Sequence, residues 1–433
     1  MHRWFKYKEG FSAQLVQNFI KEFELKPGHH ILDPFAGVST TLLVAQELGL
    51  SATGIEVMPI GDIVWKAKSR IHEYDISELF AIRDWVKSKT PQRSTKCFPH
   101  IPITRHAFAP EQEAKLMWYH EQFEALHVDA RHRELLRFIL LTVLEDISFT
   151  SKDGQFLRWD SRSEKVKLRN TRRRAVGRPP TKLFKKPRIV DVKTAVIRAL
   201  DLIIGDVSLN QESSLKKGKQ QLIIDSVLDS LPLQDESQFD AVITSPPYCN
   251  RYDYTRTYAL ELAFLGVSNK EVLDLRQKLL SCTVENRPKL MQLEDNYKNV
   301  ARLSDYEFVK TILDEHQALQ ETVEALRVRS RLREVNNRGV ISMVQGYFTE
   351  LAFVILELFN VCKKGALVAI VNDNVRYSGE IVPVDLILTD IAARIGFTPQ
   401  RIDVLPQRKG NSSQQMGKYG REALRKSILI WKK

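Results

Sequence analysis

The chain has 433 residues and a formal net charge of +12; 43% of its residues are hydrophobic and 27% are charged. These values are ordinary for a soluble globular protein, and the length allows a complete core with a second unit. No apolar run reaches the length of a membrane-spanning helix, and the first residues lack the apolar core of a signal peptide, so we expect a cytoplasmic protein without membrane contact.

The first chemical signature is a small-residue turn after a short apolar strand. His30-Ile31-Leu32 predicts a buried strand, and residues 33–41, with the sequence Asp-Pro-Phe-Ala-Gly-Val-Ser-Thr-Thr, lead into a helix. This geometry places a ligand at a helix N-terminus, and Gly37 allows the backbone to approach that ligand closely. The next strand ends in Glu56, about 20 residues beyond the turn, where a carboxylate can accept hydrogen bonds from ribose hydroxyls.

Positive charge is concentrated in one segment of the chain. Thirteen basic residues lie between Arg158 and Arg188, opposed only by Asp160 and Glu164, so this segment supplies nearly the whole excess. Such a concentration indicates a segment that binds a polyanion, and we expect it to be mobile or hairpin-like. Residues 177–180, Gly-Arg-Pro-Pro, resemble an AT-hook core that would lay an arginine along a minor groove.

The most informative turn follows the apolar strand 239–244. Its sequence is Thr244-Ser245-Pro246-Pro247-Tyr248. Neither proline can donate a backbone hydrogen bond and both have a fixed φ, so the neighbouring carbonyls are rigidly aimed. A hydroxyl and a flat aromatic ring beside such carbonyls suit a site that grips an exocyclic amino group on a planar heterocycle.

The two turns together resemble the DNA amino-methyltransferases, which use S-adenosylmethionine. The resemblance is closest to the cytosine-N4 branch, in which serine precedes the two prolines, whereas the adenine-N6 branch more often has Asp or Asn there. It covers roughly residues 1–65 and 220–433. One departure is Ser39, where the family usually has glycine. The resemblance implies an α/β fold: a doubly wound (Rossmann-like) class I methyltransferase sheet with two mainly helical inserts.

The resemblance also implies two sets of site residues, and the positive charge of the basic segment predicts a third. The catalytic set is Ser245, Pro246, Pro247 and Tyr248. The set that binds S-adenosylmethionine is Phe11, Asp33, Phe35, Gly37, Ser39, Thr40, Glu56, Asp225 and Thr244, with Glu56 on the ribose and Asp225 on the adenine amine. Beside such a core, the basic segment predicts contacts to double-stranded DNA through Arg158, Arg172, Arg173, Arg174, Arg178, Lys182, Lys185, Lys186 and Arg188.

The implied reaction is direct methyl transfer to an amine of a base extruded from the duplex. The side chain of Ser245 and the carbonyl of Pro246 would accept hydrogen bonds from the amino group, and Tyr248 would stack on the base. Cys249 is not needed, because amino methylation forms no covalent enzyme adduct. The four cysteines are scattered without a CxxC pair, and we expect no metal.

The expected organisation divides the chain into five segments. These are a cofactor-binding half at 1–65, a helical and basic insert at 66–215 that is the candidate target-recognition region, a catalytic half at 216–256, a helical excursion at 257–340, and the remaining core strands and helices at 341–433. Within the excursion, residues 311–335 are rich in Glu, Gln, Leu and Arg and predict one long amphipathic helix.

Three alternatives stay open at this point. An adenine-N6 methyltransferase is the nearest, and an RNA guanine or adenine methyltransferase with the same core is the second. The third is a non-catalytic DNA-binding protein on a degenerate methyltransferase fold, which would show no affinity for S-adenosylmethionine. A separate restriction endonuclease is a possible partner of the enzyme.

Overall fold

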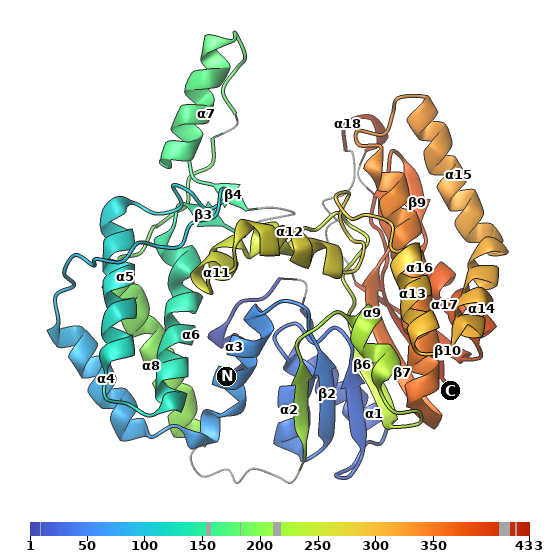
Figure 1. The fold of residues 1–433 in the computed structure, drawn as a ribbon, viewed down its shortest axis with the longest axis horizontal. Coiled ribbons are helices and arrows are strands. Elements are labelled where there is room, and N and C mark those ends of the chain that lie inside the picture. The colour runs from blue at the N-terminus through green and yellow to red at the C-terminus, as the bar shows by residue number, and fades with distance from the viewer. Residues whose placement is uncertain (9, 153–156, 182, 211–217, 407–415, 421) are drawn as a thin grey trace. The chain divides into compact units, whose positions relative to one another are not determined.

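The computed structural model describes the chain except for residues 9, 153–156, 182, 211–217, 407–415 and 421 (Figure 1). The chain forms two compact units, each assembled from three segments. The helical unit comprises Met1–Lys8, Pro59–Leu215 and Tyr254–Asp274, and the sheet unit comprises Glu9–Met58, Lys216–Asp253 and Leu275–Lys433. The five-segment division expected from the sequence stays a prediction.

The sheet unit is built on seven strands in the order β10-β11-β7-β6-β1-β2-β5. Their bounds are β1 His30–Asp33, β2 Ser51–Ile55, β5 Gln220–Ile223, β6 Phe239–Thr244, β7 Cys362–Asp373, β10 Thr398–Leu405 and β11 Lys426–Lys432. The first five strands in chain order pair in parallel, whereas β11 runs antiparallel to both β7 and β10. The predicted α/β class with a mostly parallel sheet is therefore confirmed, and the doubly wound arrangement of helices over it stays a prediction.

The strand order reverses between β1 and β6. From β1 the sheet continues through β2 to β5 on one side and through β6 to β7 on the other. The pairing of Leu32 with Val242 brings the carboxyl ends of β1 and β6 to the same edge. Ligands of open parallel sheets bind outside the carboxyl ends of the strands at such a reversal, so the fold itself marks where a site is expected.

The remaining elements of the sheet unit surround or extend these strands. The helices are α1 Ala13–Glu22, α2 Thr40–Leu48, α9 Val227–Ser230, η3 Leu231–Leu233, α13 Leu290–Asn299, α14 Leu303–Asp314, α15 Gln317–Arg331, α16 Gly339–Val361, α17 Val384–Ile395 and α18 Met416–Tyr419. A short hairpin is formed by β8 Val375–Tyr377 and β9 Glu380–Val382.

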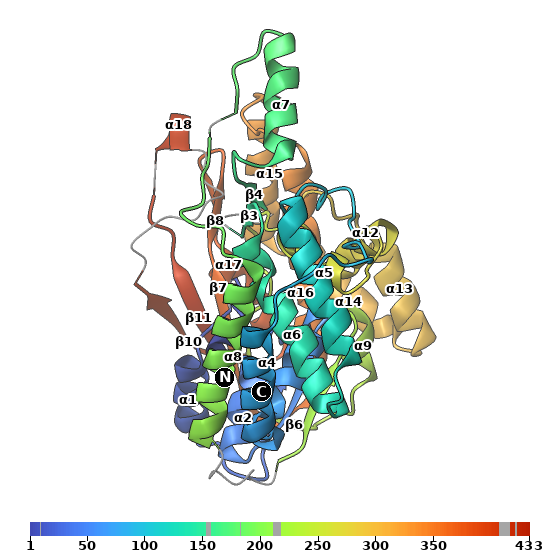
Figure 2. The same ribbon diagram turned by 90° about the vertical axis from the view of Figure 1, so that its left-hand side faces the viewer.

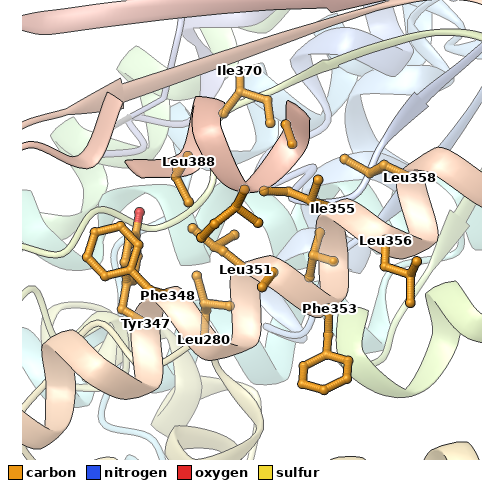
Figure 3. Packing of buried hydrophobic residues seen from close by; sticks show 14 of the residues in the cluster. Leu280, Tyr347, Phe348, Leu351, Phe353, Ile355, Leu356, Leu358, Ile370 and Leu388 are labelled. Atoms are coloured by element: carbon orange, nitrogen blue, oxygen red, sulfur yellow. The ribbon is translucent and has the colours of Figure 1, made fainter. Parts of the chain in front are cut away.

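Helix α16 is the central helix of the core of the sheet unit. It is apolar on nearly all sides, and Figure 3 shows its Leu351 and Ile355 gathered with Ile370 of β7 and Leu388 of α17. The expectation that no apolar run has membrane-spanning length was wrong for this helix, which passes that test by length and composition. Because most of it is buried among other elements, it has the character of a core helix.

The helical unit is an assembly of helices with one small hairpin (Figures 1 and 2). Its elements are η1 His2–Trp4, α3 Ile60–Ser69, η2 Ile71–Glu73, α4 Ile76–Ser88, α5 Pro110–Ala125, α6 Ala130–Ile147, β3 Thr150–Ser151, β4 Arg158–Trp159, α7 Glu164–Ala175, α8 Val192–Asn210, α10 Tyr254–Thr257 and α11 Ala259–Phe264. Helix α12, Asn269–Lys278, begins in this unit and ends in the sheet unit. Helix α8 packs against α4 and α6, and its Asp206 accepts hydrogen bonds from Arg3 and from the Trp4 indole.

Two sequence-based expectations about local structure were wrong. Residues 311–335 contain the end of α14 and the whole of α15 rather than one helix, because the chain leaves α14 after Asp314 and His316 caps the start of α15 by accepting the N–H of Leu319. The basic segment is not a hairpin throughout, since its central part is the helix α7.

Candidate functional site

The turn between β1 and α2 is tightly folded. Gly37 has φ 54°, and Ser39, the N-cap of α2, has φ 62° and ψ 35°, so two residues in three lie in the left-handed region. This region favours glycine, which gives a backbone reason for the glycine that the family usually has where this chain has Ser39. Ser39 is fully buried, and its hydroxyl has no hydrogen-bond partner among the described residues. A buried polar group of this kind at a helix N-terminus fits a site for a polar ligand.

Asp33 joins this turn to the neighbouring strand. Its carboxylate accepts the Thr41 hydroxyl of α2 at 2.7 Å, the Thr244 hydroxyl of β6 at 2.7 Å and the N–H of Phe35 at 3.2 Å. Burial raises the pKa of Asp33 to about 6, although these three hydrogen bonds act to lower it. Two residues of the expected cofactor set, Asp33 and Thr244, are therefore in direct contact, and that contact connects the cofactor turn to the catalytic turn.

Glu56 follows β2 and reaches back to the same turn. Its carboxylate accepts the N–H of Gly37 at 2.7 Å and the N–H of Met58 at 2.7 Å. Burial raises the pKa of Glu56 to about 7, against the lowering effect of these hydrogen bonds. The carboxylate thus lies beside the turn that the sequence assigned to the cofactor.

Gly54 of β2 allows the turn after β1 and helix α2 to lie close to that strand, and the sequence analysis did not single it out. A Cβ at Gly54 would lie 2.8 Å from the Cβ of Ala36 and 2.8 Å from a methyl carbon of Leu42. The turn and α2 therefore pack directly on the backbone of β2. A glycine inside a strand is the sequence signal of such an approach.

Phe11, Phe35, Thr40 and Asp225 lie in the same unit. Phe11 precedes Ser12, which caps α1 by accepting the N–H of Leu15, and Phe35 packs against the core. Thr40 is the first residue of α2. Asp225 follows β5, which pairs with β2 through Ile223 and Ile55, so Asp225 and Glu56 stand at the ends of neighbouring strands. Their contacts to a cofactor stay predictions.

The catalytic turn begins where β6 ends. The Ser245 hydroxyl oxygen lies 3.1 Å from the carbonyl oxygen of Val371 on β7 and 3.2 Å from the hydroxyl oxygen of Tyr248. Pro246 is buried and Pro247 is half-buried. When the Ser245 hydroxyl donates to Val371, the lone pairs of its oxygen stay available to accept hydrogen bonds.

Two residues beside Tyr248 were missed by the sequence analysis. The Lys426 ammonium of β11 lies 5.1 Å from the centre of the Tyr248 ring and 3.8 Å from a carboxylate oxygen of Asp373 on β7. Only 2% of Tyr248 is exposed, and burial raises the pKa of its phenol while Lys426 acts to lower it. The antiparallel pairing of Lys426 with Asp373 creates this arrangement, and no local motif announces it.

Cys249 is fully buried, and burial raises the pKa of its thiol well above the ordinary value. A thiol held neutral in this way is a poor nucleophile. Among the residues that the structure describes, no three His, Cys, Asp or Glu side chains are grouped so as to hold a metal ion.

The expected DNA contacts belong to the helical unit, around α7. Exposed side chains are those of Arg172, Arg174, Arg178, Lys185 and Arg188, while Lys182 lies outside the described residues. Arg173 is half-buried and donates to the carbonyl of Pro179, and the Arg158 guanidinium lies 3.9 Å from the centre of the Phe184 ring.

Lys186 does not fit the expected set of DNA contacts, because its side chain is buried. Only 9% of the residue is exposed, and its ammonium donates to the backbone carbonyls of Glu145, Ser148 and Thr150. An ammonium held by three carbonyls inside the protein has a structural role, so we remove Lys186 from the set.

Fold and site together define a class of protein. A mostly parallel sheet with a left-handed glycine turn after β1 and a carboxylate after β2 is the arrangement that binds nucleoside cofactors. The Ser-Pro-Pro-Tyr turn adjoins it through Asp33 and Thr244. The residues present fit S-adenosylmethionine, because a buried hydroxyl and a buried carboxylate that accepts only backbone N–H groups line this turn. The class is that of the amino-methyltransferases.

Comparison with known proteins gives the family. The DNA methylase family model matches residues 2–59. The chain is 49% identical over 435 residues to the Type II methyltransferase M.BsoBI of Geobacillus stearothermophilus, covering 100% of this chain and 86% of that protein. It is 41% identical over 440 residues to the Type II methyltransferase M.AvaI of Nostoc sp., again covering 100% of this chain and 86% of that protein. The chain therefore belongs to the N4/N6 DNA amino-methyltransferase family and is a DNA methyltransferase. Membership implies S-adenosylmethionine as the methyl donor.

Proposed function

We propose that this protein methylates the exocyclic N4 amine of a cytosine that has been extruded from double-stranded DNA. The observation that carries the proposal is the placement of the Ser245 oxygen, 3.1 Å from the Val371 carbonyl oxygen. A hydroxyl that donates to a carbonyl presents its lone pairs elsewhere, and an exocyclic amine offers two hydrogens to such an acceptor. Serine before the two prolines is also the residue of the cytosine-N4 branch.

The cofactor would be held in the sheet unit. Glu56 would accept the ribose hydroxyls, Asp225 the adenine amine, and the backbone of Gly37 with the Ser39 hydroxyl would contact the remainder. Phe11, Phe35, Thr40 and Thr244 would complete the site, with Asp33 holding the turn in shape through its three hydrogen bonds. When bound, S-adenosylmethionine supplies a methyl group on an already activated sulfonium.

The catalytic turn would hold the base and correct the poor nucleophilicity of its amine. The lone pair of a cytosine amine is delocalised into the ring, so the amine must be drawn toward tetrahedral geometry. The Ser245 oxygen and the Pro246 carbonyl would accept its two hydrogens, which fixes the direction of the lone pair. Orientation of this kind is a large part of the rate enhancement in such transfers. Tyr248 would stack on the base after Lys426 moves from its ring, and the proton would leave once the amine is cationic.

The helical unit would bind the duplex through α7 and the residues around it. The supporting observation is the exposure of Arg172, Arg174, Arg178, Lys185 and Arg188, together with their concentration in one segment. We further propose that the protein acts in the cytoplasm as the modification half of a restriction-modification system, as the Type II names of its relatives suggest. A separate endonuclease would then be its partner.

Expression in a host without DNA methylation tests the proposal. Sequencing that distinguishes N4-methylcytosine from N6-methyladenine should show N4-methylcytosine at one motif, and a host that expresses the Ser245→Ala variant should show almost none. N6-methyladenine alone would establish the adenine alternative. Absence of both marks, in a folded protein that binds S-adenosylmethionine, would overturn the proposal, and absence of cofactor binding as well would favour a non-catalytic DNA-binding protein.

A further inference from the structure

Helix α7 is held along one of its faces and, in its first turn, also through Lys165. Val166 and Asn170 are its buried residues, and Arg173 on the same face is half-buried. The Asn170 side-chain oxygen accepts the N–H and the hydroxyl of Thr181 at 3.0 Å each, and the Arg173 guanidinium donates to the Pro179 carbonyl at 2.7 Å. The returning chain therefore covers this face. Lys165 in the first turn is half-buried and its ammonium donates to the carbonyl of Ile103, and beyond that turn the other faces of α7 are exposed.

The base of α7 is rigidly built. Ser163 caps the helix by accepting the N–H of Val166, and the buried Asp160 carboxylate accepts hydrogen bonds from Arg162 and from the N–H of Lys186. In both views α7 points away from the helices α5 and α6 of its own unit (Figures 1 and 2). The fold thus presents an exposed helix on a fixed stem.

The exposed surface of α7 has two distinct parts. Leu168, Thr171, Arg172 and Ala175 are all exposed and follow the spacing i, i+3, i+4, i+7, which places them in one stripe opposite Val166 and Asn170. Basic residues flank that stripe, with Lys167 and Arg174 on one side and Arg169 on the other, all exposed. The centre of the surface is therefore apolar or small with a single arginine, and its edges are cationic.

The charge of α7 suits a polyanion. Twelve-residue helices are marginal in water by themselves, and like charges three or four residues apart, as in Arg169, Arg172 and Arg173, destabilise them further. A helix with its side chains is about 10–12 Å across, and the major groove of B-form DNA is about 12 Å wide. The major groove of A-form RNA is deep, narrow and closed to side chains, so the geometry favours DNA.

We propose that α7 is a recognition helix that enters the major groove of the DNA substrate. Its central stripe faces the base edges, with Arg172 donating to the O6 and N7 atoms of a guanine and with Leu168, Thr171 and Ala175 available for thymine methyl groups. The flanking Lys167, Arg169 and Arg174 contact phosphates on the two strands. The inference rests on the proposed function for the identity of the substrate and adds the sequence-reading element to it.

Arg172→Ala and Arg174→Ala form a matched pair for the test. Both remove an exposed arginine from the same helix, and the two differ in the face from which the arginine projects. The full-length protein is used, with thermal unfolding to show that both variants fold. Binding is measured by competition within a library of fully randomised duplexes, at several salt concentrations, and motifs methylated in the host are sequenced.

Arg172→Ala should relax the preference at one base pair by about 10- to 100-fold while other positions keep theirs. Arg174→Ala should weaken binding to all sequences alike and reduce the slope of log affinity against log salt by about one, with the motif unchanged. Equal, sequence-independent losses in both variants would overturn the proposal, because α7 would then be a phosphate clamp. A preference for duplex RNA over duplex DNA would overturn it too.

The library readout separates the two possible failures. If the protein methylates no DNA but the two variants still differ in this way, the recognition helix stands and the proposed reaction fails. If the protein methylates DNA while both variants keep the full motif and affinity, the proposed reaction stands and α7 does not read the sequence.

Discussion

The cofactor turn of the sheet unit and helix α7 of the helical unit use charged side chains in opposite ways. At the turn, Asp33 and Glu56 are buried and every hydrogen bond they accept comes from the protein's own backbone or hydroxyl groups. On α7, Arg172 and Arg174 are exposed and project into solvent. The charges of the first region hold the turn in shape, whereas those of the second face solvent.

This difference separates the effects that substitutions should have. Removing a buried carboxylate leaves its hydrogen-bond donors without an acceptor, so the free energy of unfolding and the activity of the site should fall together. Removing an exposed cation changes salt-dependent binding and leaves the fold nearly unaffected.

Ser245→Ala should lower kcat by about 100-fold or more, because it removes an acceptor placed for the reacting amine. Affinity for S-adenosylmethionine should stay near that of the parent protein. Single-turnover methylation and calorimetric titration of the cofactor measure the two quantities. Ser342→Ala, an exposed serine in the same unit, serves as the control. Equal loss of cofactor affinity would mean that the turn has a structural role.

Asp33→Ala should lower the free energy of unfolding by about 3 kcal/mol, since it leaves two hydroxyl groups and one N–H inside the protein without their hydrogen-bond acceptor. Cofactor binding should weaken as well, because the turn loses its connection to β6. Urea denaturation provides the measurement, and the exposed Asp235→Ala is the matched control. A loss no larger than that of the control would show that Asp33 does not hold the turn.

The affinity for S-adenosylmethionine should rise about tenfold as the pH increases through about 7, where Glu56 loses its proton and becomes a full acceptor for the ribose. Without cofactor the sign is opposite. The raised pKa contributes stability below the ordinary pKa of 4.5, and that contribution is lost as the pH rises through about 7. Calorimetric titration between pH 6 and 8 should give a flat profile for Glu56→Gln and the parental profile for the exposed Glu307→Gln. A parental profile in Glu56→Gln would refute this role.

Ser39→Gly should raise the free energy of unfolding by about 1 kcal/mol, because it relieves a left-handed conformation at φ 62°. If the buried hydroxyl serves the cofactor, affinity should fall in the same variant. Thermal unfolding with and without S-adenosylmethionine separates the two effects. A stabilised protein with unchanged affinity would remove Ser39 from the cofactor set.

The double variant Arg169→Ala with Arg174→Ala should change the free energy of unfolding by no more than about 0.5 kcal/mol. Both side chains are exposed, and neither takes part in the hydrogen bonds between Thr181 and Asn170. Urea denaturation at low salt is the measurement. A loss of the size expected for Asp33→Ala would break the comparison, because the arginines of α7 would then hold the protein together.

Local chemistry decides how much of the molecule could be predicted from the sequence. The turns at Asp33–Thr41 and Thr244–Tyr248 could be predicted because their signals are local: glycine permits the left-handed backbone of the first, and proline fixes φ in the second. The contact of Lys426 with Tyr248 depends on pairing between β11 and β7, which are more than 50 residues apart and carry no shared motif. Strand pairing of this kind is a tertiary property.

For the basic segment, the composition predicted the charge but not the structure. Its composition predicted a charged surface, but the sequence did not predict α7. This helix is held by a cap and by the hydrogen bonds of Asn170, and it lacks the buried apolar stripe by which a helix is recognised in a sequence. Charge alone also placed Lys186 on the surface, whereas carbonyl groups around its ammonium hold it inside. Composition reports how much charge a segment has, and only packing decides which charges face outward.

The position of β11 in the sheet bears on how the chain is made. This strand lies between β7 and β10, and the ribosome synthesises both of those before it. Until residues 426–432 emerge, β7 and β10 each present an unpaired edge, and the place later filled by the fully buried Trp431 is open. The sheet therefore cannot be completed before residues 426–432 have been synthesised, and until then the nascent protein has two edges to which another chain could add.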